Sequence, residues 1–218
     1  MFKNNELKPY RVVIFDLDGT LLDTLEDLGT AVNEALSRQH LPIHPISEYR
    51  AKVGHGIRNL VTVSLPEELR ADEGLIDTCL ADFKAYYTSH IDTLTHPYAG
   101  MPELVRELDG RLVRLAIASN KFQEGTEYLV RKFFPGIPFV AILGNREGFP
   151  LKPDPAIVRE VLEKTGAQPR ECVLVGDSPT DMKTAANGGI DGIAVNWGYR
   201  SMQGVDTVDA LRERLGCC

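Results

Sequence analysis

Two aspartates that are separated by one residue follow the first apolar run of the chain. Val12–Phe15 is a short and mostly β-branched run, and Asp16 and Asp18 come directly after it. If the alternation of a strand continues through them, both carboxylates point to the same side. Such a pair is often only a solvated turn, but it could also hold a cation while one carboxylate acts as a nucleophile. Aspartate can attack phosphorus, a bridging Mg²⁺ would offset the repulsion between carboxylate and phosphate, and the second carboxylate could transfer protons.

Polar side chains also follow two later apolar runs. Ser119 and Asn120 come at the end of the run 112–119, where a small hydroxyl could bind a phosphate oxygen, although serine is common at such positions. Asp177 follows the run 172–176. Ser178 and Asp181 are typical of the first turn of a helix, which explains them without any chemistry but leaves Asp177 unexplained.

A lysine in a proline-rich loop is the remaining candidate for chemistry. Lys152 lies in the segment 149–155, which three prolines stiffen. A stiff loop that holds a lysine near carboxylates suits a charge clamp for a transferring phosphoryl group. Most surface lysines have no such role, so Lys152 is a candidate only together with the acidic residues.

The elements that must position these side chains are strands alternating with helices. We expect strands at 12–15, 112–119, 139–143, 172–176 and 193–196, and helices at 101–108, 124–133, 155–165, 180–187 and 208–215. This pattern predicts an α/β fold with a doubly wound, mostly parallel sheet. Ligands of such sheets bind beyond the carboxyl ends of the strands, so the polar residues should converge there.

A helical stretch without a convincing strand separates the first strand from the others. We therefore predict an α/β core of residues 1–22 and 97–218 and an inserted helical cap of residues 23–96. Thr24 and Asp27 resemble a capping box at the start of the first cap helix, and Pro66 is expected to begin another helix.

Composition narrows the class of protein further. The 218 residues are 43% hydrophobic and 25% charged, with a net charge of -7, which is ordinary for a globular chain. A mildly acidic surface disfavours nucleic acid and anionic lipid as partners. The 4 cysteines show no framework spacing, and no apolar run resembles a leader or a membrane span, so we expect a cytoplasmic protein.

Taken in order, these segments resemble the four motifs of the haloacid dehalogenase (HAD) superfamily. The motifs are Phe15-Asp16-Leu17-Asp18-Gly19-Thr20, Ser119-Asn120-Lys121, Lys152-Pro153 and Gly176-Asp177-Ser178-x-x-Asp181. The match covers most of the chain and implies a Rossmann-like core with an inserted cap. Gly54-x-Gly56, Lys152-Pro153-Asp154-Pro155 and Trp197-Gly198-Tyr199 are further similar to phosphoglycolate phosphatases.

The resemblance implies roles for the acidic residues. Asp16 would be the nucleophile that forms the aspartyl-phosphate, and its other oxygen would bind Mg²⁺. Asp18 would protonate the leaving group and then activate water, while its main-chain carbonyl also binds the metal. Asp177 would be the third protein ligand of the metal, and Asp181 would hold Lys152 or a water on the metal.

The resemblance also implies which residues bind substrate. Ser119 and Lys152 would contact the phosphoryl oxygens, and main-chain N–H groups around Asn120 would add donors. In the cap, Gly56 allows close approach and Arg58 could pair with a substrate carboxylate. Arg58 could equally lie on a solvated helix face.

The implied activity is hydrolysis of a small phosphomonoester, with 2-phosphoglycolate as the leading substrate. Pyrophosphate, nucleotides and sugar phosphates are the alternatives in the same superfamily. A phosphomutase is less expected, because such relatives usually have valine where Thr20 stands. A receiver domain would be shorter and lack a cap, a dehalogenase would lack the acid at Asp18, and a non-catalytic protein would be free to lose Asp16 or Asp18.

Overall fold

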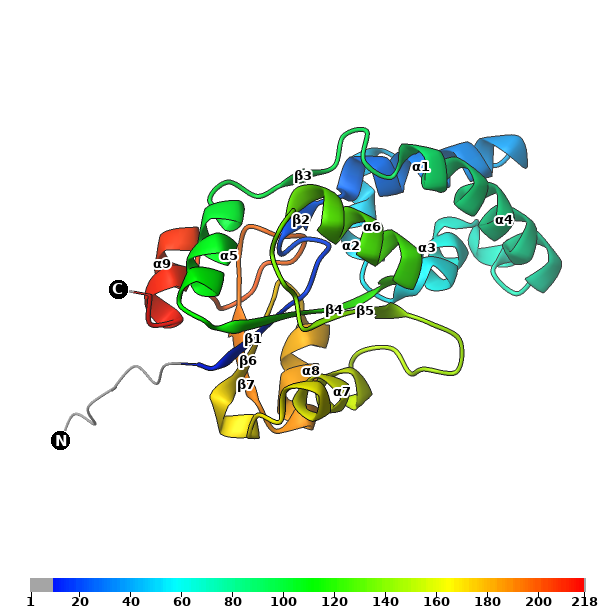
Figure 1. The fold of residues 1–218 in the computed structure, drawn as a ribbon. Coiled ribbons are helices and arrows are strands. Elements are labelled where there is room, and N and C mark those ends of the chain that lie inside the picture. Colours follow the sequence, from blue (N-terminus) through cyan, green and yellow to red (C-terminus); the bar gives the residue numbers. More distant parts are fainter. Residues whose placement is uncertain (1–9, 218) are drawn as a thin grey trace.

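A parallel sheet forms the centre of the computed structural model, which describes residues 10–217. In this part of the chain five strands pair in parallel in the order β5-β4-β1-β6-β7 (Figure 1). The predicted mostly parallel sheet is therefore confirmed. Residues 1–9 of the expected core segment lie outside the described residues. The strands are β1 (Val12–Phe15), β4 (Arg114–Phe122), β5 (Ala141–Asn145), β6 (Cys172–Gly176) and β7 (Asp191–Ala194).

Helices cover both faces of the sheet because its strands alternate apolar side chains to both sides. Val13 and Phe15 of β1 pack in the cluster that contains helices α5, α6 and α9, whereas Val12 and Ile14 pack with α7 and α8. Figure 1 shows these two helical layers above and below the strands. The helices are α5 (Met101–Gly110), α6 (Gln123–Phe133), α7 (Ala156–Thr165), α8 (Pro179–Gly188) and α9 (Val208–Arg214), with the 3-10 helix η3 (Pro169–Glu171) before β6.

The helical stretch before the sheet's second strand lies to one side of the sheet in Figure 1. A two-stranded antiparallel pair joins its two ends, with Leu22 opposite Pro97 and Asp23 opposite His96. The expectation of no strand within 23–96 therefore missed one residue at each end. The elements are β2 (Leu22–Asp23), α1 (Leu25–Arg38), η1 (Ile46–Glu48), α2 (Tyr49–Lys52), α3 (Gly56–Ser64), η2 (Glu67–Leu69), α4 (Glu73–His90) and β3 (His96–Pro97).

Both expected helix starts in this stretch exist, but neither has the expected form. Pro66 precedes only the short 3-10 helix η2, and the long helix α4 begins after Asp72, whose side chain accepts a hydrogen bond from the Leu75 N–H (3.0 Å). Thr24 precedes α1 but makes no side-chain capping bond, because its hydroxyl donates to the Asp18 carboxylate instead (2.7 Å).

Asp27, the other half of the expected capping box, anchors the return of the chain to the core. Its buried carboxylate accepts hydrogen bonds from the Leu94 N–H (3.0 Å), the Thr95 N–H (2.8 Å) and the Thr95 hydroxyl (2.8 Å). A buried carboxylate needs such donors. Asp27 thereby ties the segment that leaves the helical stretch to the helix that enters it.

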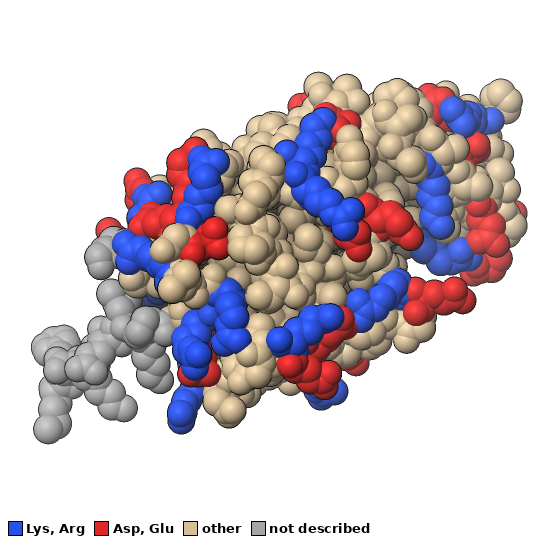
Figure 2. Space-filling model, in the orientation of Figure 1, with Lys and Arg blue, Asp and Glu red and all other residues tan. Residues whose placement is uncertain are grey.

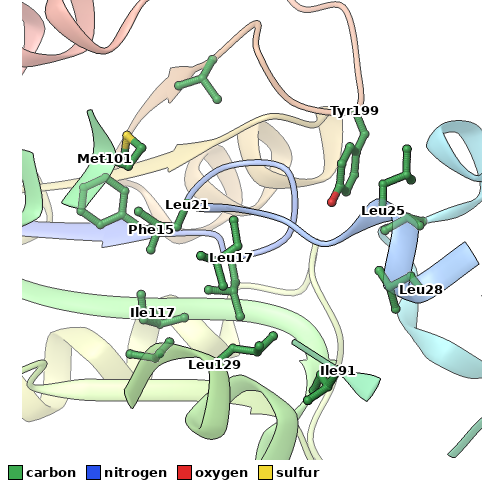
Figure 3. Packing of buried hydrophobic residues seen from close by; sticks show 14 of the residues in the cluster. Phe15, Leu17, Leu21, Leu25, Leu28, Ile91, Met101, Ile117, Leu129 and Tyr199 are labelled. Atoms are coloured by element: carbon green, nitrogen blue, oxygen red, sulfur yellow. The ribbon is translucent and has the colours of Figure 1, made fainter. Parts of the chain in front are cut away.

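One hydrophobic cluster runs from the sheet into the helical stretch. Leu17 and Leu21 follow β1 and extend the packing of Phe15 towards Leu25 and Leu28 of α1 (Figure 3). The same cluster includes buried residues of α4. The loop that carries the two motif aspartates is thus packed on its apolar side, which fixes the direction of its polar side chains.

The surface carries both signs of charge. Figure 2 shows Lys and Arg side chains interspersed with Asp and Glu side chains over the face in view. That face has no continuous basic stripe of the kind that a nucleic acid backbone needs. Within residues 10–217, no helix is both long enough and apolar enough to cross a bilayer.

Candidate active site

A cavity of about 50 Å³ lies where the carboxyl ends of the central strands meet. Asp16 follows β1, Asp177 follows β6, and Ser119 lies in the last part of β4. All three line the cavity, together with Asp18 and Asn120. The convergence expected from strand order is therefore present, because β1 lies between β4 and β6 in the sheet.

Lys152 lies at the back of this cavity as a buried cation. Its Nζ atom is 2.8 Å from Asp16 Oδ1 and 2.6 Å from Asp181 Oδ1, and it donates a third hydrogen bond to the Ala118 carbonyl (2.8 Å). All three ammonium hydrogens thus have acceptors. Burial by itself lowers the pKa of Lys152, but the charges of Asp16 and Asp181 more than offset it, so the pKa is raised and the lysine stays charged.

Asn120 holds the Lys152 loop in place. Its side-chain oxygen accepts from the Lys152 N–H (2.8 Å), and its amide donates to the Lys152 carbonyl (3.1 Å). The same amide also donates to the Gly54 carbonyl (2.9 Å), which belongs to the helical stretch. Asn120 therefore bridges the core, the lysine loop and the helical stretch through one buried side chain.

Asp181 lies behind the lysine and begins helix α8. Its Oδ2 atom accepts from the Ser178 N–H (3.1 Å) and the Ser178 hydroxyl (2.6 Å), while the Asp181 N–H donates back to Ser178 Oγ (3.3 Å). The expected helix start is confirmed as a capping box with Pro179 in the first turn. Asp181 is fully buried, so the cap and the ion pair with Lys152 are made by the same side chain.

Burial shifts the pKa values of Asp16 and Asp177, two of the residues that line the cavity. It raises the pKa of Asp16 well above its ordinary value; the Asp181 charge adds to this effect and Lys152 opposes it. Burial likewise raises the pKa of Asp177 to about 6, although the Tyr199 N–H donates to its Oδ2 (2.6 Å) and opposes the shift. A cation in the cavity would restore the charged forms of both carboxylates.

Asp18 is held by two groups that come from different parts of the chain. Its Oδ1 atom accepts from the Thr24 hydroxyl (2.7 Å) and from Lys121 Nζ (3.2 Å). The Lys121 ammonium also donates to the Tyr87 hydroxyl (2.6 Å) of α4. The Tyr199 hydroxyl lies 3.0 Å from Thr24 Oγ1, which extends the network to the loop after β7. Within residues 10–217, no hydrogen bond engages Asp18 Oδ2.

No role of Lys121, Tyr87 or Tyr199 was evident from the sequence. Lys121 stands next to Asn120 in the second motif, so its position was visible but its direction was not. Tyr87 stacks on Phe83 (ring centroids 5.1 Å apart), as an aromatic residue on a buried helix face does. Its hydroxyl nevertheless reaches a core lysine 34 residues away, which no local pattern indicates.

Two glycines allow the loops around Asp177 to touch. A Cβ atom on Gly198 would lie 2.2 Å from the Gly19 carbonyl oxygen and 2.4 Å from the Asp177 side chain. Gly19 itself has a φ of +85° and would also clash with Asp177 if it carried a side chain. The main chain of the next residue, Tyr199, is also held in place, because its N–H donates to Asp177 Oδ2.

The expected cap residues have different positions. Gly56 lines the cavity, and a Cβ atom there would lie 3.3 Å from Leu151. Arg58 does not line it; Nη1 donates to Asp77 (2.6 Å) and Nη2 pairs with Glu73 at the exposed surface. Its guanidinium is thus engaged by two carboxylates of α4, outside the cavity that Asp16, Asp18 and Asp177 line. The structure favours the solvated-face alternative for Arg58.

Comparisons with known proteins agree with this geometry. The model of the haloacid dehalogenase-like hydrolase family matches residues 13–195. A phosphoglycolate phosphatase of Mesorhizobium japonicum is 33% identical over 86% of this chain and 83% of its own length. A phosphoglycolate phosphatase of Pseudomonas putida is 32% identical, over 95% of this chain and 79% of its own length. A crystal structure from Lactobacillus delbrueckii subsp. bulgaricus, 32% identical, covers 95% of this chain and 99% of its own with a TM-score of 0.86.

Proposed function

This chain belongs to the haloacid dehalogenase-like hydrolases and is a phosphoric monoester hydrolase, and we propose that it hydrolyses 2-phosphoglycolate to glycolate and phosphate through an aspartyl-phosphate, with Mg²⁺. The placement of Asp16, Asp18 and Lys152 in one small cavity supports this chemistry most directly. The substrate follows the activity of the curated relatives.

The carboxylates of the cavity fit a hard divalent cation. Asp16, Asp177 and Asp181 each place an oxygen within 4.8 Å of the others. Both oxygens of Asp181 are engaged, by Lys152 and Ser178. Asp16 and Asp177 each keep one oxygen that makes no hydrogen bond within residues 10–217. We propose these two carboxylates and the Asp18 carbonyl as ligands, because Mg²⁺ prefers oxygen donors.

In the proposed first step, a carboxylate oxygen of Asp16 forms a bond to phosphorus and the bond from phosphorus to the leaving oxygen breaks. Bound Mg²⁺ would reduce the repulsion between this carboxylate and the phosphoryl group. Lys152 opposes the effect of burial on the Asp16 pKa and would lie beside the incoming phosphoryl oxygens. Ser119, whose oxygen accepts from the Lys121 N–H (3.2 Å), keeps its own hydrogen for a phosphoryl oxygen.

We propose that Asp18 moves the protons of both steps. Its Oδ1 atom is fixed by Thr24 and Lys121, so Oδ2 is the oxygen that would face the reacting group. It would give its proton to the leaving alkoxide and then take one from the water that attacks phosphorus, while the bond from Asp16 to phosphorus breaks. The products are glycolate, phosphate and the regenerated Asp16 carboxylate.

We further propose that residues 23–96 act as the cap of this site and that residues 1–22 and 97–218 form the core. Gly54 and Gly56 line the cavity from the cap side. The β2 and β3 pair joins the two chain crossings next to the motif loop.

We keep a cytoplasmic location as part of the proposal. Cys79 and Cys172 are buried thiols outside any disulfide. Burial raises the pKa of Cys172 to about 11, so its thiol is held in the unreactive form. Structural thiols of this kind suit a reducing compartment.

Phosphate release from a panel of substrates tests the proposal. The panel holds 2-phosphoglycolate, pyrophosphate, nucleoside monophosphates and sugar phosphates, each with Mg²⁺ and with chelator. We expect the highest kcat/KM on 2-phosphoglycolate, loss of activity in chelator, and a loss of about 10³-fold or more in Asp16→Asn. A higher kcat/KM on another substrate would show that 2-phosphoglycolate is not the preferred substrate. Transfer of the phosphoryl group to a second position of the same substrate would show that the protein is a mutase.

Acid-quenched mass spectrometry tests the covalent step separately. During turnover the wild-type protein should gain the mass of one phosphoryl group on the peptide that contains Asp16. Asp16→Asn should show no such gain. Full Mg²⁺-dependent turnover by Asp16→Asn would refute the aspartyl-phosphate mechanism.

A further inference from the structure

The loop after β7 brings a third cation to the cavity besides Lys121 and Lys152. Arg200 is half-buried and lines the cavity. Its Nη2 atom donates to the Ala51 carbonyl (3.0 Å) and the Val53 carbonyl (2.9 Å), at the end of α2. These carbonyls are left without helical partners at a helix C-terminus, which explains why a guanidinium binds there.

The other terminal nitrogen of the same guanidinium, Nη1, lacks a hydrogen-bond partner within residues 10–217. Arg200 Nη1 is buried and makes no hydrogen bond to any part of the chain that the structure describes. Leaving a buried charged donor without an acceptor is costly, so such groups usually meet a ligand or water. The hydrogens on Nη1 therefore favour an anionic or polar occupant of the cavity.

The two lysines of the cavity are already engaged. Lys152 pairs with Asp16 and Asp181, and Lys121 pairs with Asp18. No carboxylate within residues 10–217 forms an ion pair with Arg200. Among the described residues that line this cavity, Arg200 is thus the cation that forms no ion pair, although its charge opposes the rise in the Asp177 pKa.

The cap side of the cavity offers no charge of its own. The residues that line it from this side are Val53, Gly54, Gly56, Ile57 and Leu60. Arg200 is fixed to that side by its bonds to Ala51 and Val53, whereas Lys152 and Ser119 lie on the strand side. A leaving group that extends from the strand side towards the cap would meet Arg200 as its charged contact.

We propose that Arg200 binds the carboxylate of the leaving group through Nη1 and so determines specificity for carboxylate-bearing phosphomonoesters. This role rests on the proposed function, because it supplies the carboxylate contact that 2-phosphoglycolate requires. It takes the place of the contact that the sequence suggested for Arg58. Because Nη2 ties the same group to α2, binding of the carboxylate and contact with the cap depend on one side chain.

Two phosphonates that differ only in the carboxylate provide the probe. 3-Phosphonopropionate is the methylene analogue of 2-phosphoglycolate and cannot be hydrolysed, and propylphosphonate has a methyl group in place of the carboxylate. Calorimetry with Mg²⁺ gives both dissociation constants for each variant. We expect wild-type protein to bind 3-phosphonopropionate about 100-fold more tightly, as a charge-assisted buried contact implies.

Arg200→Gln should remove this preference and leave propylphosphonate binding within about threefold of wild type. Arg200→Lys keeps the charge and should retain part of the preference, about tenfold. Arg70→Gln is the matched control, because Arg70 also donates to two cap carbonyls, of Leu65 (3.0 Å) and Val63 (3.2 Å), but lies outside the cavity. Each preference is a ratio within one variant, so a partly unfolded fraction cancels.

The outcomes separate the two proposals. Equal loss of both phosphonates in Arg200→Gln would show that Arg200 only holds the cap, and it would overturn the specificity role. A retained preference in Arg200→Gln with unchanged binding of propylphosphonate would assign the carboxylate to another group. A wild-type protein that binds propylphosphonate but shows no preference would instead refute the proposed substrate.

Discussion

Replacing Asp177 with asparagine is expected to stabilise the metal-free protein at neutral pH while removing its response to Mg²⁺. Burial raises the pKa of Asp177 from an ordinary value of 3.8 to about 6, against the opposing hydrogen bond from Tyr199. The carboxylates of Asp16 and Asp181 each have an oxygen within 4.8 Å of an Asp177 oxygen. The charged form of Asp177 is therefore unfavourable in the folded protein when no cation is present.

The size and sign of this effect follow from proton linkage. The folded state binds the Asp177 proton more tightly than the unfolded state does. The resulting stabilisation is present below pH 3.8 and is lost as the pH rises through about 6. At about 1.4 kcal/mol for each tenfold change in proton affinity, the full effect is about 3 kcal/mol. Asparagine has no charge to bury, but its amide hydrogens need acceptors, so we expect a gain of about 1 to 2 kcal/mol.

Thermal unfolding at pH 7.5 and pH 4.5, in chelator and in Mg²⁺, measures the effect. For a chain of this length, about 1 to 2 kcal/mol corresponds to a rise in Tm of about 2 to 8 °C for Asp177→Asn in chelator at pH 7.5. The rise should shrink at pH 4.5, where wild-type Asp177 is protonated. Mg²⁺ at tenfold its dissociation constant should stabilise the wild type by about 1.4 kcal/mol and leave the variant unchanged.

Three results would refute this reasoning. A lower Tm of the variant in chelator at pH 7.5, or a difference that does not depend on pH, would show that burial of the Asp177 charge is not costly. An equal response of both proteins to Mg²⁺ would exclude Asp177 as a ligand. Glu163→Gln is the control, because it removes an exposed carboxylate on α7 and should change neither Tm nor the Mg²⁺ response.

Three further substitutions test other parts of the site. Lys152→Met leaves the buried carboxylates of Asp16 and Asp181 without their cation. We expect it to lower the free energy of unfolding in urea titrations by about 3 to 5 kcal/mol, less at low pH, and to abolish turnover. An unchanged free energy of unfolding would contradict the buried ion pairs. Tyr87→Phe removes a buried acceptor of Lys121 and should cost about 1 to 3 kcal/mol in the same titration, whereas an unaltered midpoint would mean that the hydroxyl is dispensable. Gly198→Ala would place a Cβ atom 2.2 Å from the Gly19 carbonyl oxygen and should lower both kcat/KM and Tm. The control is Gly110→Ala in α5, where a Cβ atom meets nothing within 4 Å; it should be neutral or stabilising by about 0.5 to 1 kcal/mol. Equal effects of the two substitutions would refute the close contact at Gly198.

The sheet and the approach of its polar strand ends could be predicted from local patterns. A run such as Cys172–Gly176 is apolar on both faces and is followed at once by a polar residue, so it indicates a buried strand that ends at Asp177. Parallel strands share one carboxyl edge, so such residues must come together once the sheet forms. The capping box of Ser178 and Asp181 was equally visible, because its partners are three residues apart.

Local sequence patterns gave wrong hydrogen-bond partners for side chains that bind a distant segment in place of a neighbouring residue. Thr24 and Asp27 have the spacing of a capping box, but the tertiary structure offers Asp18 to one and the main chain around Thr95 to the other. Arg58 follows a glycine-rich loop, yet α4 places two carboxylates beside it.

The strands, most of the helices and the meeting of the motif aspartates can be read from the sequence, because they follow from hydrophobic periodicity and from the geometry of a parallel sheet. Two contacts depend on the packing of the whole chain: Lys121 binds Asp18 and Tyr87, and Arg200 reaches Val53 across 147 residues. Arg200 Nη1 is left without a partner among residues 10–217. The physical reason is that hydrogen bonds between distant segments depend on how helices pack. A shift of about 1 Å in that packing is enough to make or break a hydrogen bond of a charged group. Residue spacing along the chain therefore does not predict such contacts.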